Sequence, residues 1–520
     1  MDPLRILIFG THPNQYNGYS KVVYELIACL AKRPDLAVTV YGFQKFQVMP
    51  GHRVDIPANI ELYDAFEHET PKGQGFGVTE VREFIKKNKP DVCIVYNDMM
   101  IIHQIVSQLK LSQKDDGMVF KIIGYIDQVY LNQKKDFIDF CNANLDYGLM
   151  FTEDWRKNIL DQGLTLPNGF LQHGFNPQIY FPIPKRLARA YYNIHPNDFV
   201  ILNLNRNQPR KRWDLCLKAF AEIVSRYPKE PIKMVMGTAV QGAWNLVEIY
   251  ERELKKRGVS LADGMAHMIV IDRPQKMNDE ETNILYNIAD IGINTCDGEG
   301  FGLCNFEQGG IGIPQIVPRL GGFKDFFDDS MAMMIEPKMA YYVDNSRDMV
   351  CGEALLCDYV DFSEAIETYY FNKETRDLHG RNARARVLKD YKWTDISDKL
   401  YDIVYEVSGR AKPSVLAAAA AAAAAASTTA TASVAQLVSE VEKIDLAMLM
   451  PSTAAPAAPV VAEAPIAAAV PAPTPVPAPV ASSSSHSRLK KKSSSKKKKD
   501  IIRELRKQLE KLQEDDSDSS

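Results

Sequence analysis

The segment 293–307, INTCDGEGFGLCNFE, carries two carboxylates, Glu299 and Glu307, on either side of a glycine-rich stretch. Gly300 and Gly302 leave backbone N–H groups uncovered, and the residues after Gly302 can begin a helix, whose N-terminus attracts anions. Each carboxylate could accept hydrogen bonds from sugar hydroxyls. On spacing alone, two ordinary surface acids around a strand–turn–helix explain the segment equally well.

Two basic residues, Arg206 and Lys211, lie in the segment ILNLNRNQPRKRWDLCLKAF, between a predicted strand and a predicted helix. A guanidinium can bind phosphate oxygens through two hydrogen bonds, and an ammonium binds them as a point charge. The pair could therefore hold a diphosphate. Taken alone, a short run of basic residues is more often a solvated loop than a binding site.

Two loops near the N-terminus carry weaker candidates. Gly18 lies in THPNQYNGYSKVVYEL, between the first predicted strand and the first predicted helix, and turn geometry explains a glycine there about as well as ligand binding does. Asp127 follows an apolar segment in IGYIDQVY. A loop aspartate that is satisfied by its neighbours is an equally good interpretation of this residue.

The elements that must position these residues alternate between strand and helix patterns. Near-continuous apolar runs such as RILIFG and DVCIVYN are separated by amphipathic stretches such as YSKVVYELIACLAKR. This alternation is typical of a parallel sheet with helices on both faces. The pattern restarts after about residue 185, so we predict an α/β protein with two Rossmann-like domains that face each other across a cleft. Ligands bind such sheets beyond the carboxyl ends of the strands.

The composition changes after about residue 410. Ten consecutive alanines span 417–426, a Pro/Ala/Val stretch covers roughly 451–482, and eight basic residues without an acid lie between Arg488 and Lys499. Such a composition cannot build a core, so we predict that 411–520 is a low-complexity, mostly disordered tail rich in Ala, Pro, Ser and Lys. Short helices are possible near 433–450 and 500–513. The basic cluster 488–499 could contact an anionic membrane surface, act as an import signal or nucleic-acid patch, or simply keep the chain soluble.

The overall composition argues against several classes of protein. The 520 residues carry 62 Lys+Arg and 66 Asp+Glu, a net charge of −4, which does not suit a globally basic, specific nucleic-acid-binding protein. No run of 18 apolar residues predicts a membrane span. The eight cysteines form no CxxC pair and no metal-ligand spacing, so we expect a reducing compartment, a cytoplasmic location and no metal site.

The run from Glu299 to Glu307, with Gly321-Gly322 downstream, resembles the E-x7-E segment of retaining GT-B glycosyltransferases, group 1 (glycosyltransferase family 4). Arg206 and Lys211 match the Arg and Lys of that family's G-R-x-x-x-x-K-G pattern, and 171–182 resembles its link between domains. The resemblance covers roughly residues 4–410. The departures are four: Cys304 replaces a usual Pro, Gln308-Gly309-Gly310 the usual E-A-M-A-like residues, Arg212 a usual Gly, and Tyr19 the second Gly of the first loop.

The resemblance implies a nucleotide-sugar donor and assigns a role to each candidate. Arg206 and Lys211 would hold the diphosphate, Glu299 the donor sugar and Glu307 the nucleotide ribose. Asp127 lies where family members often have a His or an acid near the transferred sugar. The candidate catalytic residues are therefore Arg206, Lys211, Glu299 and Asp127, and the candidate donor-binding residues are Gly18, Gly300, Phe301, Gly302, Leu303 and Glu307.

The resemblance also implies the reaction and the domain roles. A sugar would pass with retention of configuration to a glycan, lipid or protein acceptor, without a metal or other cofactor. Residues 1–182 would form the acceptor domain, completed by a C-terminal helix at about 391–410 that crosses back onto it, and 183–390 would form the donor domain. Two alternatives stay open: a nucleotide-sugar epimerase on the same fold, and a non-catalytic scaffold that binds nucleotide sugars.

Overall fold

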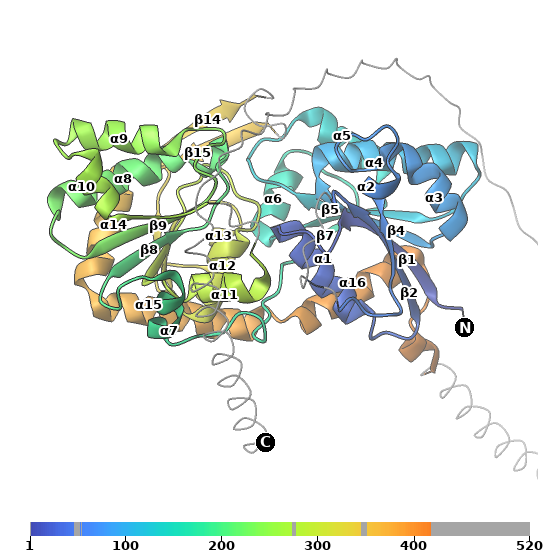
Figure 1. Cartoon of the computed structure of the whole chain (residues 1–520). Helices are drawn as coiled ribbons and strands as arrows, with labels where there is room; N and C mark the ends of the chain where they lie inside the picture. The colour runs from blue at the N-terminus through green and yellow to red at the C-terminus, as the bar shows by residue number, and fades with distance from the viewer. Residues whose placement is uncertain (1, 46–52, 54, 273–276, 345–350, 418–520) are drawn as a thin grey trace, which may run out of the picture. The chain divides into compact units, whose positions relative to one another are not determined.

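The computed structural model describes residues 2–45, 53, 55–272, 277–344 and 351–417. Residues 1–411 group into one compact unit, which contains two separate parallel sheets flanked by helices (Figure 1). The predicted class, an α/β protein with two Rossmann-like domains, is confirmed. The predicted tail falls almost entirely on 418–520, which lies outside the described residues.

The first sheet has the strand order β3-β2-β1-β4-β5-β6-β7 and all its strands run parallel. Its strands are β1 (Leu4–Thr11), β2 (Leu36–Phe43), β3 (Glu61–Asp64), β4 (Val92–Asp98), β5 (Lys121–Asp127), β6 (Tyr147–Met150) and β7 (Asn168–Phe170). The helices among them are α1 (Gly18–Leu30), α2 (Ala65–His68), η1 (Val78–Glu80), α3 (Val81–Asn88), α4 (Met99–Asp115), α5 (Lys135–Asn144) and α6 (Glu153–Asp161).

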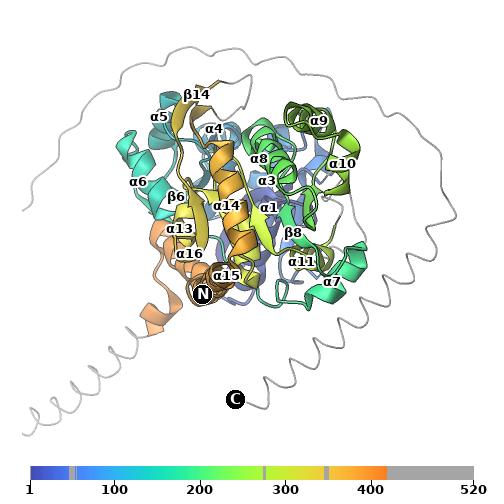
Figure 2. The ribbon, with the colours of Figure 1, turned by 90° about the vertical axis from the view of Figure 1, so that its left-hand side faces the viewer.

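The second sheet has the order β10-β9-β8-β11-β12-β13 and is also parallel throughout. Its strands are β8 (Phe199–Asn203), β9 (Ile232–Gly237), β10 (Met268–Ile271), β11 (Ile291–Ile293), β12 (Gln315–Pro318) and β13 (Ala332–Ile335). Its helices are α7 (Lys185–Tyr192), η2 (Pro209–Lys211), α8 (Trp213–Arg226), α9 (Leu246–Lys256), α10 (Leu261–Ala266), α11 (Asp279–Tyr286), α12 (Leu303–Ile311), α13 (Phe323–Phe326), α14 (Tyr359–Phe371) and α15 (Lys373–Asp390). Figure 2 shows α14 and α8 lying side by side over this sheet.

Local sequence explains why these elements form. The strands β1, β4 and β8 are buried along nearly their whole length, because helices cover both faces of each parallel sheet. Helix α8 buries Trp213, Cys216, Leu217 and Phe220, at the three- and four-residue spacing of one helical face. Helix α4 begins where the Asp98 carboxylate accepts the N–H groups of the first turn.

One element of the fold has no counterpart in the sequence prediction. Strands β14 (Met339–Val343) and β15 (Gly352–Leu356) pair antiparallel and form a hairpin outside both parallel sheets. Among the residues that the structure describes, no helix has the length and apolar character needed to cross a membrane.

The last described long helix, α16 (Trp393–Ser408), packs against α1 of the first sheet, as Figure 1 shows. The Asp35 carboxylate accepts hydrogen bonds from Tyr401 and Tyr405 at 2.7 and 2.6 Å. At the start of the helix, the Trp393 indole lies over Gly174, so closely that a Cβ on Gly174 would be 2.6 Å from the ring. The chain therefore needs a residue without a side chain where α16 enters the first domain.

We expect Gly174→Ala to lower the melting temperature, because its Cβ must displace the Trp393 ring, and overpacking of this kind costs about 1–3 kcal/mol. Differential scanning calorimetry measures the effect. Gly148→Ala is the matched control, since its Cβ would meet its nearest neighbour, Leu166, at an ordinary 3.4 Å. Equal melting temperatures for the two variants would contradict this packing.

Candidate active site

The glycine-rich turn joins β11 to α12, and the N-terminus of α12 has no side-chain cap. Gly302 has a φ of 93° and precedes α12, and no side chain accepts a hydrogen bond from the first turn of this helix. The left-handed φ favours glycine, and a Cβ on Gly302 would lie 2.4 Å from the Phe323 ring. The N–H groups at the start of α12, beginning with Leu303, are therefore not capped by a side chain of the protein.

Glu299 lies in this turn as a buried carboxylate paired with cations. It is 7 % exposed, its Oε2 accepts a hydrogen bond from Lys211 Nζ, and its Oε1 lies 3.6 Å from Arg210 Nη1. Burial would raise the pKa of Glu299, but Lys211 and Arg210 hold it below its ordinary value. The structure thus brings two predicted catalytic residues, Glu299 and Lys211, into direct contact.

The loop that carries Arg206 and Lys211 is joined to the Glu299 turn by backbone hydrogen bonds. The Asp297 N–H donates to the Arg210 carbonyl at 3.0 Å, and the Thr295 hydroxyl donates to the Arg212 carbonyl at 2.9 Å. The indole of Trp213 supports the other end, because it donates to the Arg206 carbonyl at 3.3 Å. These hydrogen bonds therefore fix the Arg206–Lys211 loop and the Glu299 turn relative to each other.

Arg206 differs from its neighbours because its guanidinium forms no hydrogen bond or ion pair within the described parts of the chain, although the residue as a whole is exposed. The surrounding protein and the charge of Arg210 lower the pKa of Arg206, while Glu299 acts in the opposite direction. An unpaired cation beside a second cation creates a positive potential that an anionic ligand would relieve.

Glu307, on α12, is buried and fully engaged by other side chains. Lys21 Nζ lies 2.9 Å from both of its carboxylate oxygens, and the Tyr286 hydroxyl donates to it at 2.6 Å. Lys21 lies on α1, which packs on the first sheet, and Glu307 lies on α12 beside the second. The ion pair therefore connects the two domains. A ligand hydroxyl that binds Glu307 must compete with the Lys21 ammonium.

Asp127 ends β5 and faces the glycine-rich turn of the other sheet. Its Oδ2 accepts a hydrogen bond from the Tyr19 hydroxyl, whereas its buried Oδ1 has no hydrogen-bond partner among the described residues. A Cβ on Gly300 would lie 2.0 Å from this oxygen. Burial raises the pKa of Asp127 to about 6, against the hydrogen bond from Tyr19.

Two further contacts fix the turn against the first sheet. Trp155 Nε1 donates to the Gly300 carbonyl at 2.8 Å, and a Cβ on Gly18 would lie 2.9 Å from Leu303 Cδ1. Phe301 is buried among aromatic rings that include His173 and Phe306, so its backbone rather than its side chain is available to a ligand. All ten predicted site residues thus lie in two facing groups of loops or in the elements that adjoin them, namely α1, β5, η2 and α12.

A cavity between the two sheets confirms that they face each other. Lys21, Glu25 and Arg53 line it from one side, and Asp279, Leu303 and Glu307 from the other. Arg53 and Asp279 form a two-pronged ion pair across it, at 2.8 and 2.9 Å. This pair and the Lys21–Glu307 pair hold the cleft closed in the structure.

Sequence reasoning missed several of these residues. Lys21 and Trp155 make contacts across the two domains, and Tyr19 donates a hydrogen bond to Asp127 within the first. Only Tyr19 carried a signal, as a departure from a glycine pair. The structure explains why glycines occupy positions 321 and 322. Cβ atoms there would lie 2.0 and 2.4 Å from the backbone of Glu299 and Phe301. Within the described ranges, no group of three or more His, Cys, Asp or Glu side chains is arranged to hold a metal ion.

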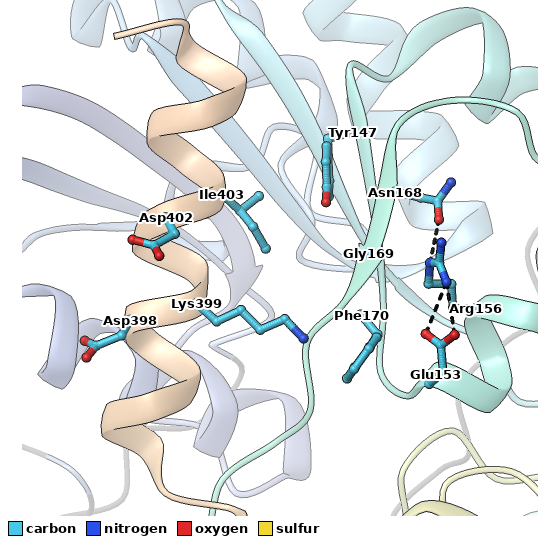
Figure 3. Close-up of a pocket in the computed structure, with 10 residues that line it drawn as sticks. All are labelled: Tyr147, Glu153, Arg156, Asn168, Gly169, Phe170, Asp398, Lys399, Asp402 and Ile403. Carbon is cyan, nitrogen blue, oxygen red and sulfur yellow. Dashed lines mark hydrogen bonds and ion pairs between the residues drawn. The ribbon is translucent and has the colours of Figure 1, made fainter. Parts of the chain in front are cut away.

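A larger cavity of about 500 Å³ lies elsewhere, where α16 passes β6 and β7 (Figure 3). Lys399 Nζ lies 3.4 Å from the centre of the Phe170 ring, and Arg156 bonds to Glu153 and Asn168. None of the predicted site residues lines this cavity. The cavity lies at the junction of α16 with the first sheet, so it is separate from the site formed by the loops of Glu299 and Arg206.

The comparisons with known proteins agree with this fold. No protein-family model matches the chain. It is 31 % identical over 144 residues to D-inositol 3-phosphate glycosyltransferase 2 of Catenulispora acidiphila, which covers 27 % of this chain and 32 % of the relative. It is 24 % identical over 247 residues to D-inositol 3-phosphate glycosyltransferase of Saccharomonospora viridis, covering 47 % and 52 %. The matched parts are therefore about a third to a half of each relative's length.

Solved structures match over more of the chain. Sucrose-phosphate synthase from Thermosynechococcus elongatus gives a TM-score of 0.58 at 14 % identity and covers 78 % of this chain and 99 % of its own. Anabaena HepE in complex with UDP and glucose gives 0.57 at 12 % identity, covering 78 % and 100 %. At such identity the likeness concerns the fold, and it confirms the predicted GT-B arrangement.

The raised pKa of Asp127 predicts a pH dependence of stability. Its folded-state pKa, about 6, lies above the ordinary 3.8, so the folded state binds this proton more tightly and Asp127 costs stability as pH rises through that window. Asp127→Asn removes the cost. Its melting temperature relative to wild type should therefore be higher at pH 7.5 than at pH 4.5, as measured by calorimetry.

Asp91→Asn is the control with the opposite sign. Although burial acts to raise the pKa of Asp91, Arg5 holds it below its ordinary value, so that variant should lose more stability at pH 7.5 than at pH 4.5. The same pH trend in both variants would contradict the environment described for Asp127.

Proposed function

We propose that this GT-B protein is a retaining glycosyltransferase that uses a nucleotide-sugar donor and needs no metal ion. The observation that carries the proposal is the unpaired Arg206 guanidinium, held on one loop with Lys211 and next to the Glu299 turn. The uncapped N-terminus of α12 follows that turn directly. Cations and free N–H groups around a buried carboxylate suit a ligand that is anionic at one end and hydroxylated at the other.

The chemistry follows from where charge develops. When the anomeric C–O bond breaks, the leaving diphosphate gains negative charge and the sugar ring gains positive charge. Arg206, Lys211 and the first N–H groups of α12 would stabilise the diphosphate, and groups aimed at developing charge contribute on the order of 3–4 kcal/mol each. Lys211 would then move its interaction from Glu299 towards the phosphate, which frees the Glu299 carboxylate to accept sugar hydroxyls.

Retention would follow from attack on the same face as the leaving group. The departing phosphate oxygen accepts the proton of the acceptor hydroxyl, so no separate base is required. Asp127, with its unpartnered Oδ1 against Gly300, would face the ring that becomes positive. The cleft would have to close again around the bound donor, and it would then keep water away from the reacting carbon.

Glu307 would bind the nucleotide ribose only after a rearrangement. Its oxygens are held by Lys21 and Tyr286, so the ribose hydroxyls would displace the ammonium of Lys21. Lys21 lies on α1 in the other domain, and its release would loosen the cleft as the donor enters. Donor binding and opening of the cleft are thereby linked.

The names of the relatives suggest which substrates to try first. UDP-glucose and UDP are the ligands named for Anabaena HepE, and inositol 3-phosphate is named for the bacterial relatives. The protein should be incubated with UDP-, GDP- and ADP-sugars, with and without inositol 3-phosphate, lipid and glycan acceptors, and analysed by mass spectrometry and NMR. A glycosylated product with the anomeric configuration of the donor supports the proposal.

Two other outcomes would favour the alternatives. An isomeric nucleotide sugar formed without any acceptor indicates an epimerase, and binding without turnover indicates a scaffold. Contact of the basic run 488–499 with an anionic membrane surface is also a proposal, and it rests on composition alone because that run lies outside the described residues.

Arg206→Ala and Lys211→Ala should each lower kcat by about 100-fold, because each removes a cation from the leaving diphosphate. Steady-state kinetics with the active donor measures this. Arg226→Ala is the control, since Arg226 lies at the end of α8 and pairs with Glu222 and Glu367 instead. Near-wild-type turnover in both test variants would mean that the diphosphate binds elsewhere.

Glu299→Gln and Glu307→Gln should separate two effects. The first should mainly lower kcat, because Glu299 would meet the reacting sugar, and the second should mainly raise the donor KM, because Glu307 would meet the ribose. Activity of the wild type should survive EDTA. Small and equal effects of the two substitutions, or loss of activity with EDTA that added Mg²⁺ restores, would contradict these assignments.

A further inference from the structure

Arg212 adopts a backbone conformation that suits glycine better. Its φ is 46° and its ψ is 48°, in the left-handed region, where a residue with a side chain pays about 1–2 kcal/mol. It follows Lys211 directly and precedes α8. We therefore expect the Arg212 side chain to make contacts that offset this backbone strain.

The Arg212 side chain makes three contacts. Its guanidinium bonds to both oxygens of Asp214 at 2.8 and 2.9 Å, to Asp297 Oδ2 at 3.4 Å and to the Tyr341 hydroxyl at 3.5 Å. The Asp214 contact is local, within the first turn of α8. The other two reach the Glu299 turn and the hairpin β14–β15, which are far away in the sequence.

Asp297 is the point at which these segments meet. Its side chain is fully buried, and Tyr341 donates a hydrogen bond to its Oδ2. Its backbone carbonyl accepts from the Leu355 N–H at 2.9 Å, and its own N–H donates to Arg210. Asp297 lies two residues before Glu299, so a shift of Asp297 moves that catalytic candidate.

The hairpin β14–β15, which contacts Asp297, also contacts the other domain. Leu131 and Glu353 exchange two backbone hydrogen bonds, of 3.1 and 2.7 Å, as neighbouring antiparallel strands do. Val343 and Ala354 of the hairpin share a small buried cluster with Val129 and Tyr130. That cluster begins two residues after Asp127.

We propose that Arg212 is a positioning residue that couples the two sides of the site through Asp297, Tyr341 and the hairpin β14–β15. Fixing Asp297 orients Glu299 beside Lys211, and the same hairpin fixes the loop that follows Asp127. This inference rests on the proposed function for its effect on catalysis, but the coupling itself is a property of the protein without substrate.

Hydrogen–deuterium exchange of the full chain tests the coupling without any substrate. Tyr341→Phe removes one hydroxyl, and Arg212→Gly removes the guanidinium and the backbone strain together. Both should speed exchange in peptides covering 295–302 and 128–133. Asp214→Asn is the control: it weakens only the local contact and should leave 128–133 unchanged. Faster exchange confined to 208–216, or unchanged exchange at 128–133 in both variants, would overturn the coupling.

Kinetics test the effect on catalysis. Each of the two variants should lower kcat about tenfold or more and leave the donor KM within about twofold, because small misplacements of catalytic groups cost rate more than binding. A rise in donor KM with unchanged kcat would overturn the positioning role. If the wild type turns over no nucleotide sugar, the proposed function fails, and the exchange experiment still decides the coupling.

Discussion

The contact between Asp127 and Gly300 is the constraint on which the site depends. The Asp127 carboxylate oxygen lies only 2.0 Å from where the Cβ of any residue other than glycine would be, and Trp155 donates a hydrogen bond to the carbonyl of the same glycine. The carboxyl ends of two separate sheets can meet this closely only because residue 300, at their point of contact, has no side chain. The same requirement extends to Gly321-Gly322, which lie against the other side of the turn.

Among the described residues, the charged side chains around this contact form ion pairs, except for Arg206. Glu299 is held by Lys211 of its own domain, and Glu307 by Lys21 of the other domain. Pairing lets two carboxylates stay buried, since an unpaired buried charge is costly. Arg206 is the cation left without such a partner in the described structure, which leaves positive potential in the cleft for a phosphate. A ligand with both phosphates and hydroxyls could exchange with the internal partners of the glutamates.

Much of this could be predicted from the sequence, because the signals are local. Apolar runs and amphipathic helices repeat along the chain, so the two parallel sheets followed, and the GT-B fold is confirmed. Glycines and charged residues at fixed spacing identified the Glu299 turn and the Arg206 loop. The roles of these residues and the domain boundaries stay predictions.

The remainder could not be predicted, because it depends on contacts between distant segments. Nothing about the residue Lys21 indicates that its ammonium meets Glu307, 286 positions later. The hairpin β14–β15 leaves several outward residues exposed, among them Met339 and Tyr342, so its pattern carried no core signal. The sequence shows Arg212 in place of a usual glycine, but its left-handed conformation and its contacts with distant segments are visible only in the structure.

The most direct measurement is a crystal structure of the protein with the nucleoside diphosphate of its active donor bound. The diphosphate should lie within hydrogen-bond distance of Arg206, Lys211 and the first N–H groups of α12, with Lys21 displaced from Glu307. A diphosphate bound away from Arg206 and Lys211, with both glutamates still in their internal ion pairs, would contradict the proposed site.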